Sequence, residues 1–221
     1  VRVRGDQSDL ERLRIESHGE TVTVEPQSLG WRRWAQVDVA IAVGEPPDIR
    51  ARLAAGDLFV DTPSGEVDVT TASGGVTAGV VHGRLAARVA SGDVAATAAG
   101  SLNVVAASGD VRVGRVLGSA EVRTASGDVD LGMVGGELSA HTASGDLGIS
   151  RFEGDRLTAK TVSGDVQVGV PAGRRYAVSL QSLSGAVRTQ FPVADEAGGL
   201  TARLEVSSVS GDITIGAAPA G

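Results

Sequence analysis

The sequence contains no cysteine and few aromatic residues. Among its 221 residues are two tryptophans, one tyrosine and three phenylalanines. The absence of cysteine excludes disulfide bonds, thiolate nucleophiles and zinc–thiolate sites, and it leaves the redox compartment open. With 31 glycines and so few aromatic side chains, the chain is expected to form one elongated domain rather than a globule around a large core.

Positive charge is also scarce. Lysine occurs only once, at Lys160, among 20 basic residues, and the formal net charge is -7. Because an acidic surface is repelled by phosphates, nucleic acid is not expected as a general partner. No apolar run approaches the roughly 18 residues of a membrane-spanning helix, so no membrane span is predicted in this chain.

One tripeptide is abundant. Ser-Gly-Asp, or a one-letter variant of it, occurs nine times between Ser64 and Asp212. The serines at positions 73, 91, 108, 126, 144 and 163 are 17 to 19 residues apart. Such a regular interval is typical of stacked repeats.

Each repeat unit reads as two short strands and two tight turns. An alternating apolar run such as Val111-Arg112-Val113 follows each tripeptide, and a second glycine about nine residues after the turn opens another alternating run. Alternation with period two indicates a strand with one buried face. Glycine can adopt the positive φ of a tight turn, and serine and aspartate can accept hydrogen bonds from turn amides.

These units predict an all-β fold. Stacked units of about 18 residues would form a flattened β-solenoid, with two sheets of inward-facing alanine and valine in contact. An antiparallel meander is also compatible with the spacing. The solenoid is favoured because a lone meander would leave one side of its apolar face uncovered.

The chain divides into four predicted regions. Residues 1–60 would form N-terminal strands and a cap, because an open strand edge invites pairing with another molecule. Residues 61–170 would be the regular solenoid, and 171–216 longer, irregular repeats with a C-terminal cap. Residues 217–221 are expected to be a disordered tail.

Three stretches of the sequence resemble a known family. They are the "SGDV" turns, "VDVAIAVGEPPDIRARLAAGDLFV" at 37–60 and "VQVGVPAGRRYAVSLQSLSGAV" at 166–187. The chain is similar in these segments to the DUF4097 family of bacterial β-strand-repeat proteins, which often carry the label adhesin. The resemblance extends from Leu13 to Ile215, and it implies a β-solenoid-like fold without an established catalytic activity.

The resemblance also bears on localisation. Related proteins often lack an export signal, which favours the cytoplasm. The chain begins at Val1 rather than at methionine, and an export signal upstream would place it at the cell surface instead.

The aspartates of the tripeptides are expected to lie in one column, because equivalent residues of a parallel solenoid stack about 4.8 Å apart. We interpret this column as turn chemistry; a ladder of calcium sites is the alternative, but it would need more glycines and a second liganding position in each half-unit. No metal or cofactor is therefore predicted. The column comprises Asp93, Asp110, Asp128, Asp146 and Asp165.

A second predicted column faces outward on the strand that precedes the turn. It comprises Arg88, Val105, Arg123, His141 and Lys160. A charged row generally keeps a sheet face soluble. Alternatively, this one binds an anionic polymer or an acidic protein surface.

The segment Trp31-Arg32-Arg33-Trp34 is the most unusual of the N-terminal region. Tryptophan and arginine are enriched at interaction hot spots. The favoured interpretation is nevertheless that the two tryptophans cover the open end of the solenoid as part of its cap.

The predicted function is a non-enzymatic, adhesin-like scaffold that presents repeated faces to an unidentified protein or surface partner. One alternative is a filament that self-assembles through its end strands. Another is a polysaccharide-active β-helix enzyme, although the aromatic residues are scattered and Ser-Gly-Asp lacks the strand-to-helix elbow of a nucleophilic serine.

Overall fold

The computed structural model describes residues 2–4, 13–18, 21–26, 38–40, 45–172, 174–190 and 202–219. The chain divides into two units, Val1–Glu45 and Pro46–Gly221. The larger unit is a β-solenoid, and each turn of its coil is here called a rung. Equivalent strands pair in parallel, commonly with partners 18 residues apart such as Val122 and Ala140. Parallel pairing confirms the solenoid and excludes the antiparallel meander.

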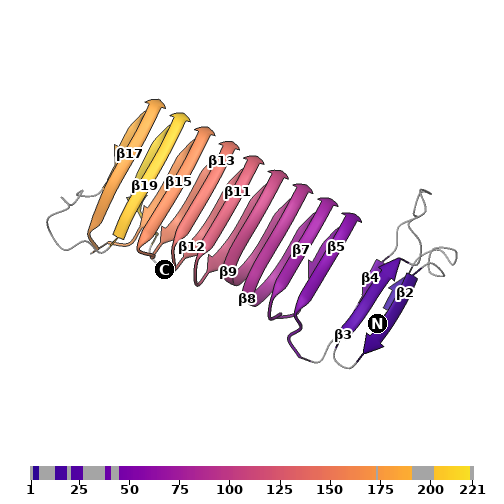
Figure 1. Cartoon of the computed structure of the whole chain (residues 1–221). Coiled ribbons are helices and arrows are strands. Elements are labelled where there is room, and N and C mark those ends of the chain that lie inside the picture. Colours follow the sequence, from indigo (N-terminus) through magenta and orange to yellow (C-terminus); the bar gives the residue numbers. More distant parts are fainter. Residues whose placement is uncertain are drawn as a thin grey trace. The chain divides into compact units, whose positions relative to one another are not determined.

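Strands that end at the tripeptide turn make one side of the solenoid, face A (Figure 1). Their pairing order is β5 (Ile49–Ala55), β7 (Val67–Ser73), the second half of β8 (Val76–Ser91), the second half of β9 (Val94–Ser108), β11 (Ala120–Ser126), β13 (Leu138–Ser144), β15 (Arg156–Ser163), β19 (Ala202–Ser210) and β17 (Tyr176–Ser184).

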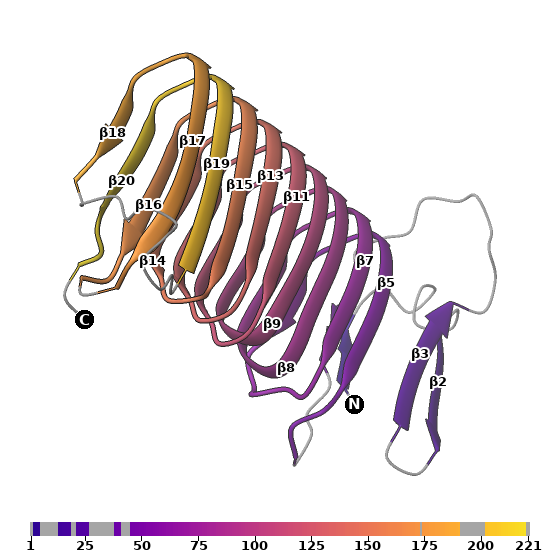
Figure 2. The same cartoon turned by 60° about the vertical axis from the view of Figure 1, so that its left-hand side comes forward.

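Strands that follow the turn make the opposite side, face B (Figure 2). β8 and β9 run from face B into face A, so both faces belong to one 16-stranded sheet. The pairing order of face B is β6 (Leu58–Val60), the first halves of β8 and β9, β10 (Val111–Val116), β12 (Val129–Val134), β14 (Leu147–Phe152), β16 (Val166–Val170), β20 (Ile213–Ala217) and β18 (Val187–Thr189).

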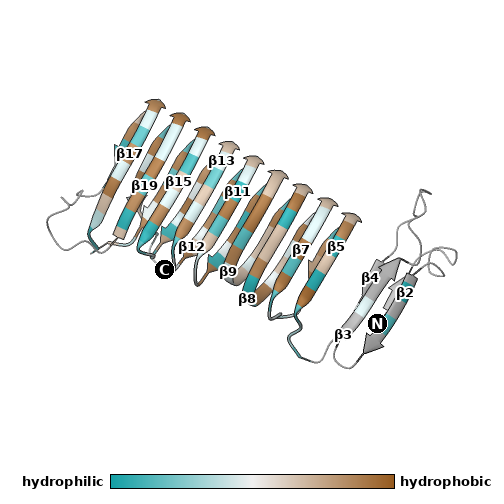
Figure 3. Cartoon of the chain, viewed as in Figure 1, coloured by the Kyte–Doolittle hydropathy of each residue, from teal (hydrophilic) through white to brown (hydrophobic). Residues whose placement is uncertain are grey.

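The core lies between the two faces. On β11, Ala120 and Val122 are buried, whereas the alternate residues Glu121 and Arg123 face solvent. Figure 3 shows the same alternation of hydrophobic and hydrophilic residues along the strands. Valine, alanine, leucine and isoleucine supply most of the buried apolar side chains, as the alternating runs predict. Side chains this small allow the two faces to approach closely.

A single glycine makes each tripeptide turn. β11 ends at Ser126, Gly127 has a φ of 134°, and β12 begins at Val129. A Cβ on Gly127 would also overlap the carbonyl oxygen of Gly109 in the preceding rung. Glycine is therefore required both by the backbone angle and by the space between rungs. Positive φ is shared by Gly56, Gly74, Gly92, Gly109, Gly127, Gly145, Gly164 and Gly211.

Two turns differ from the assignment made by the repeat pattern. Ser64-Gly65-Glu66, counted among the tripeptides, belongs to the opposite turn, because the amides of His82 and Gly83 donate to the carbonyls of Ser64 and Gly65. Conversely, Gly56 makes a turn of the tripeptide type, with a φ of 123°. The repeat pattern does not reveal this turn, because Ala55 stands in the place of serine.

The last two rungs do not stack in sequence order. β15 pairs with β19, and β19 pairs with β17. On face B, β16 pairs with β20, which pairs with β18. After β16 the chain therefore skips one place, forms the outermost rung from β17 and β18, and returns to fill the gap with β19 and β20 (Figures 1 and 2). The long spacings after Ser163 reflect this crossover.

Hydrogen bonds hold the crossover and the end of the chain. The Tyr176 hydroxyl donates to the carbonyl of Pro171 at 3.1 Å, and the Arg174 guanidinium donates to the Asp155 carboxylate at 2.8 Å. Residues 217–219, expected in the disordered tail, are ordered: Ala217 ends β20, and the Ala218 amide donates to the carbonyl of Val170 at 2.9 Å. Residues 220–221 lie outside the described ranges.

The smaller unit contains two antiparallel pairs. β1 (Arg2–Arg4) pairs with β4 (Asp38–Ala40), and β2 (Leu13–His18) pairs with β3 (Thr21–Pro26). None of these strands joins the 16-stranded sheet. Residues 49–60, assigned above to the N-terminal region, form the first rung of the solenoid, and the capping role of the preceding strands stays a prediction. None of the described residues lies in a helix long and apolar enough to cross a membrane.

Paired substitutions can separate the two demands on glycine. Gly127→Ala is expected to lower the free energy of unfolding by about 3 kcal/mol or more, because backbone strain adds to overlap with the neighbouring rung. Gly56→Ala introduces the same strain, but no atom lies within 4 Å of the added Cβ. It should cost about 1 to 2 kcal/mol. Urea denaturation followed by circular dichroism measures both; equal losses would show that contact between rungs imposes no constraint.

Candidate functional site

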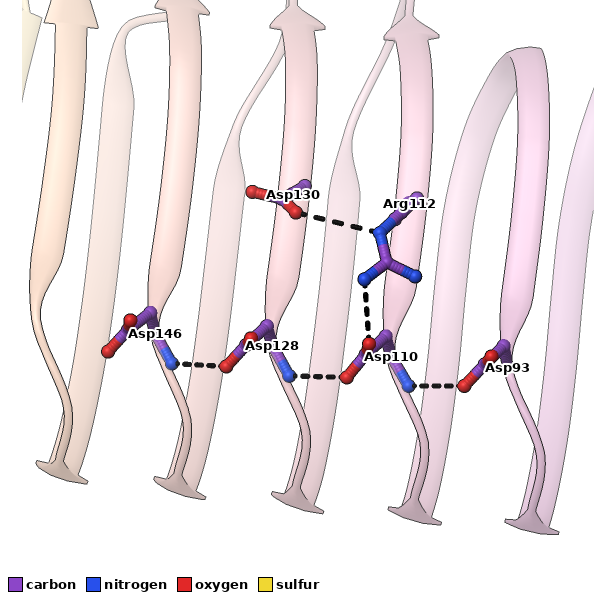
Figure 4. A network of polar contacts seen from close by, with 6 residues as sticks. All are labelled: Asp93, Asp110, Arg112, Asp128, Asp130 and Asp146. Carbon is purple, nitrogen blue, oxygen red and sulfur yellow. Dashed lines mark hydrogen bonds and ion pairs between the residues drawn. The ribbon is translucent and has the colours of Figure 1, made fainter.

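The tripeptide aspartates form a continuous ladder along the edge between the two faces (Figure 4). In each rung, the carboxylate Oδ1 accepts a hydrogen bond from the backbone N–H of the next aspartate in the stack. The N···O distances are 2.9 Å from Asp110 to Asp93, 3.0 Å from Asp128 to Asp110, 2.9 Å from Asp146 to Asp128, 2.8 Å from Asp165 to Asp146 and 2.7 Å from Asp212 to Asp165. We call these six residues the aspartate ladder.

The glycine turn explains why a carboxylate is needed. The carbonyl oxygen of Gly109 lies against the Cα of Gly127 instead of opposite an amide. The Asp110 carboxylate provides an acceptor for the N–H of Asp128 in the next rung. An amide without an acceptor would be costly wherever water is excluded. The ladder is therefore part of the rung stacking, which supports the interpretation as turn chemistry.

The ladder has a defined beginning and end. Gly75 donates its amide N–H to Asp57 Oδ1 at 2.8 Å. Gly75 has no side chain, so it has no carboxylate that could accept the amide N–H of Asp93. At the other end, the Ala186 amide donates to Asp212 Oδ1 at 2.8 Å, and alanine has no carboxylate to continue the series. The outermost rung thus closes the ladder.

Two ladder carboxylates also bind arginines. Arg112 donates to Asp110 Oδ2 and Arg188 to Asp212 Oδ2, both at 2.7 Å. The pKa of Asp110 lies below its usual value chiefly because of the hydrogen bond from the Asp128 amide, and that of Asp212 chiefly because of the bond from the Ala186 amide. Within the described ranges, no group of three or more histidine, cysteine, aspartate or glutamate side chains is arranged to hold a metal ion.

The predicted cationic column is in register on face A. The pairings align Arg88, Val105, Arg123, His141 and Lys160 across five rungs. Acidic side chains that were not foreseen accompany three of the cations. The distances between the side-chain nitrogen and the carboxylate oxygen are 3.9 Å for Arg88 and Asp68, 2.5 Å for Arg123 and Glu121, and 3.0 Å for Lys160 and Glu205.

His141 contributes less positive charge than its position suggests. Burial lowers the pKa of His141, and Arg123 and Lys160 on either side lower it further. Its Nε2 lies 3.1 Å from the Ser139 hydroxyl. The column is therefore mostly a set of ion pairs with a neutral imidazole at neutral pH, which weakens the case for binding an anionic polymer.

A third outward column is apolar, and it is not among the columns predicted above. The residue before the serine of each tripeptide is exposed on face A, two residues beyond the cationic column along the strand. Its side chains enlarge toward the outermost rung, where Val162 is 54%, Val209 46% and Leu183 85% exposed. We call this the apolar row: Ala72, Ala90, Ala107, Ala125, Ala143, Val162, Val209 and Leu183. Its signal in the sequence is the invariably apolar residue before Ser-Gly.

Face B carries a groove of about 560 Å³ on its outer side. Small residues line much of it, including Thr97, Gly114 and Gly132, and the only charged residues in its lining are Arg112 and Asp130, whose Nε and Oδ2 atoms are 3.8 Å apart. Glycoside hydrolysis generally needs two carboxyl groups across the scissile bond. The lining supplies one, so the groove does not favour the polysaccharide-active alternative. Trp31-Arg32-Arg33-Trp34 lies outside the described residues.

Comparison with known protein families identifies the family to which this chain belongs. A family model described as Toastrack DUF4097 matches residues 7–216. The chain belongs to the DUF4097 family. A search of curated proteins and a search of solved structures find no match. Membership in DUF4097 confirms the resemblance carried by the Ser-Gly-Asp repeat.

The ladder predicts a specific pH dependence of stability. Asp110 and Asp212 have pKa values below the ordinary 3.8 in the folded chain. Their contribution is complete above the pKa of the unfolded chain and is lost as pH falls through the lower folded pKa. The urea midpoint should therefore decrease between about pH 5 and about pH 2.

The matched variant combines Asp110→Asn with Asp212→Asn. Asparagine keeps an oxygen acceptor for the next amide but does not titrate in this range. The urea midpoint of this double variant should change less than that of the wild type over the same pH interval. An equally steep decrease in both proteins would show that these two carboxylates do not couple protonation to folding.

Proposed function

We propose that this DUF4097 chain is a non-enzymatic, adhesin-like scaffold that binds a protein or surface partner through the outer side of face A. The observation that carries the proposal is the apolar row. Contiguous exposed apolar side chains are uncommon on soluble proteins and often mark interaction sites. The row repeats in register with the rungs, so it offers the same contact many times.

The surroundings of the row support an interface of this type. The neighbouring cationic column is largely paired with acids such as Glu121 and Glu205, which gives the row a polar border with little net charge. Interfaces commonly combine an apolar centre with a polar rim. Binding should therefore depend on shape and apolar contact more than on long-range attraction, and it should change little with salt.

The proposal is tested by adding charge to the row without disturbing the core. The triple variant Ala107→Glu, Ala125→Glu and Ala143→Glu changes three exposed positions of face A. The control Thr97→Glu, Ser150→Glu and Gln167→Glu adds the same charge to exposed positions of face B. Each protein, tagged identically, is used for affinity capture from cells of the source species with quantitative mass spectrometry.

The expected result is a partner that the wild type and the face B control retain and that the face A variant loses by at least tenfold. Thermal unfolding of the three proteins establishes that they are equally folded. Identical sets of captured proteins would contradict binding through face A. Loss from the face B control alone would move the interface to the groove.

A further inference from the structure

Among the residues that the structure describes, no rung covers part of the apolar surface of the outermost rung. Val178 and Leu180 of β17 point toward the core but are only partly buried. The equivalent residues of β19, Leu204 and Val206, are each 1% exposed. On face B of the same rung, Val187 is 45% exposed. The end of the solenoid therefore exposes core-type side chains next to an edge strand.

The edge strand itself lacks the usual protection. Edge strands of soluble proteins commonly carry charged residues or proline, which discourage pairing with another molecule. Residues 176–187, which include all of β17, contain neither a charged side chain nor proline. The adjacent β19 carries Arg203 and Glu205. The more strongly protected strand is thus inside, and the neutral one is at the edge.

The crossover is responsible for this arrangement. If the last rungs stacked in sequence order, β19 would be outermost and its charges would lie at the edge. Instead the chain passes over one position, held by the hydrogen bonds of Arg174 and Tyr176, and covers β19 on both sides. The topology therefore presents the strand that is best suited to pairing.

We propose that two copies of the chain pair tail to tail through their β17 strands, related by a two-fold axis. The two strands would run antiparallel and continue face A from one copy into the other. Each edge is then covered by the other copy, so the assembly closes as a dimer and does not grow. This inference goes beyond the proposed function, because it uses the strand edge and not the outer side of face A.

Ala186 favours this arrangement over a head-to-tail filament. A parallel stack would require a carboxylate at position 186 to accept the amide of the next rung, and alanine supplies none. In the antiparallel tail-to-tail pair, the Ala186 turn of one copy lies at the opposite end of the paired strands from the Ala186 turn of the other copy, so this arrangement requires no carboxylate at position 186. The end of the aspartate ladder thus coincides with the proposed interface.

The first test is the mass in solution. Light scattering over a hundredfold concentration range should show the wild type rising from 22.2 kDa to twice that mass and no further. The variant Ser179→Lys with Gln181→Lys places like charges opposite each other and should remain at 22.2 kDa. The control Asn103→Lys with Val105→Lys changes the same two columns in an interior rung and should dimerise like the wild type.

Each other outcome contradicts the proposal. A wild-type mass that stays at 22.2 kDa excludes pairing, and a mass that grows beyond the dimer indicates a filament. Dimers that persist in the β17 variant but not in the interior control place the interface elsewhere. None of the substitutions at 179 and 181 touches the apolar row, so failure here leaves the proposed partner-binding role separately testable.

The second test measures the orientation of the two copies. Because the chain has no cysteine, Gln181→Cys and Arg52→Cys each allow a single spin label at opposite ends of one outward column. Tail-to-tail pairing predicts a 181–181 distance below about 20 Å and a 52–52 distance of about 80 Å, from the spacing of about 4.8 Å between strands. A 181–181 distance of about 40 Å would instead indicate head-to-tail stacking and would overturn the proposal.

Discussion

The structure depends on one contact that repeats between neighbouring rungs, the close approach of the turn glycine of one rung to the carbonyl oxygen of the turn glycine in the rung beside it. Any side chain at Gly127 would enter the space that the Gly109 carbonyl occupies. A shift of the register by one residue would bring a Cβ into this space, and it would also exchange the inward and outward faces of the strand. The contact therefore fixes the register of both faces at once.

Variation in rung length is consequently confined to the opposite turn. From Val81 to Arg84 the pairing between β8 and β9 shifts, and partners change from 18 to 17 residues apart. The 19-residue spacing between His141 and Lys160 also arises at the opposite turn. Before this turn, Phe152 pairs with a residue 18 positions earlier, and after it Leu157 pairs with a residue 19 positions earlier. The tripeptide edge tolerates no such change, which explains why its spacing is so visible in the sequence.

The regular part of the fold follows from local pattern, whereas the partners of the outward charges follow only in part. Alternation predicts the strands, and the 18-residue period predicts which residues share a column, so the aspartate ladder and the alignment of Arg123, His141 and Lys160 are accessible from sequence. Glu121 could also have been recognised as a partner of Arg123, since it stands two residues earlier on the same strand. Glu205 could not, because its contact with Lys160 exists only once β19 lies beside β15.

Periodicity also cannot choose the order of the last two rungs, because β17 and β19 have the same alternating pattern and the same Ser-Gly turn. The ladder can. In sequence order, Asp165 would accept the amide of Ala186, and the amide of Asp212 would then face an alanine without an acceptor. In the observed order, Asp212 donates to Asp165 and Ala186 donates to Asp212, so both amides are satisfied. An unmade hydrogen bond costs more than a made one contributes. The position of a single alanine therefore favours the crossover, and the crossover in turn determines which strand forms the end of the solenoid.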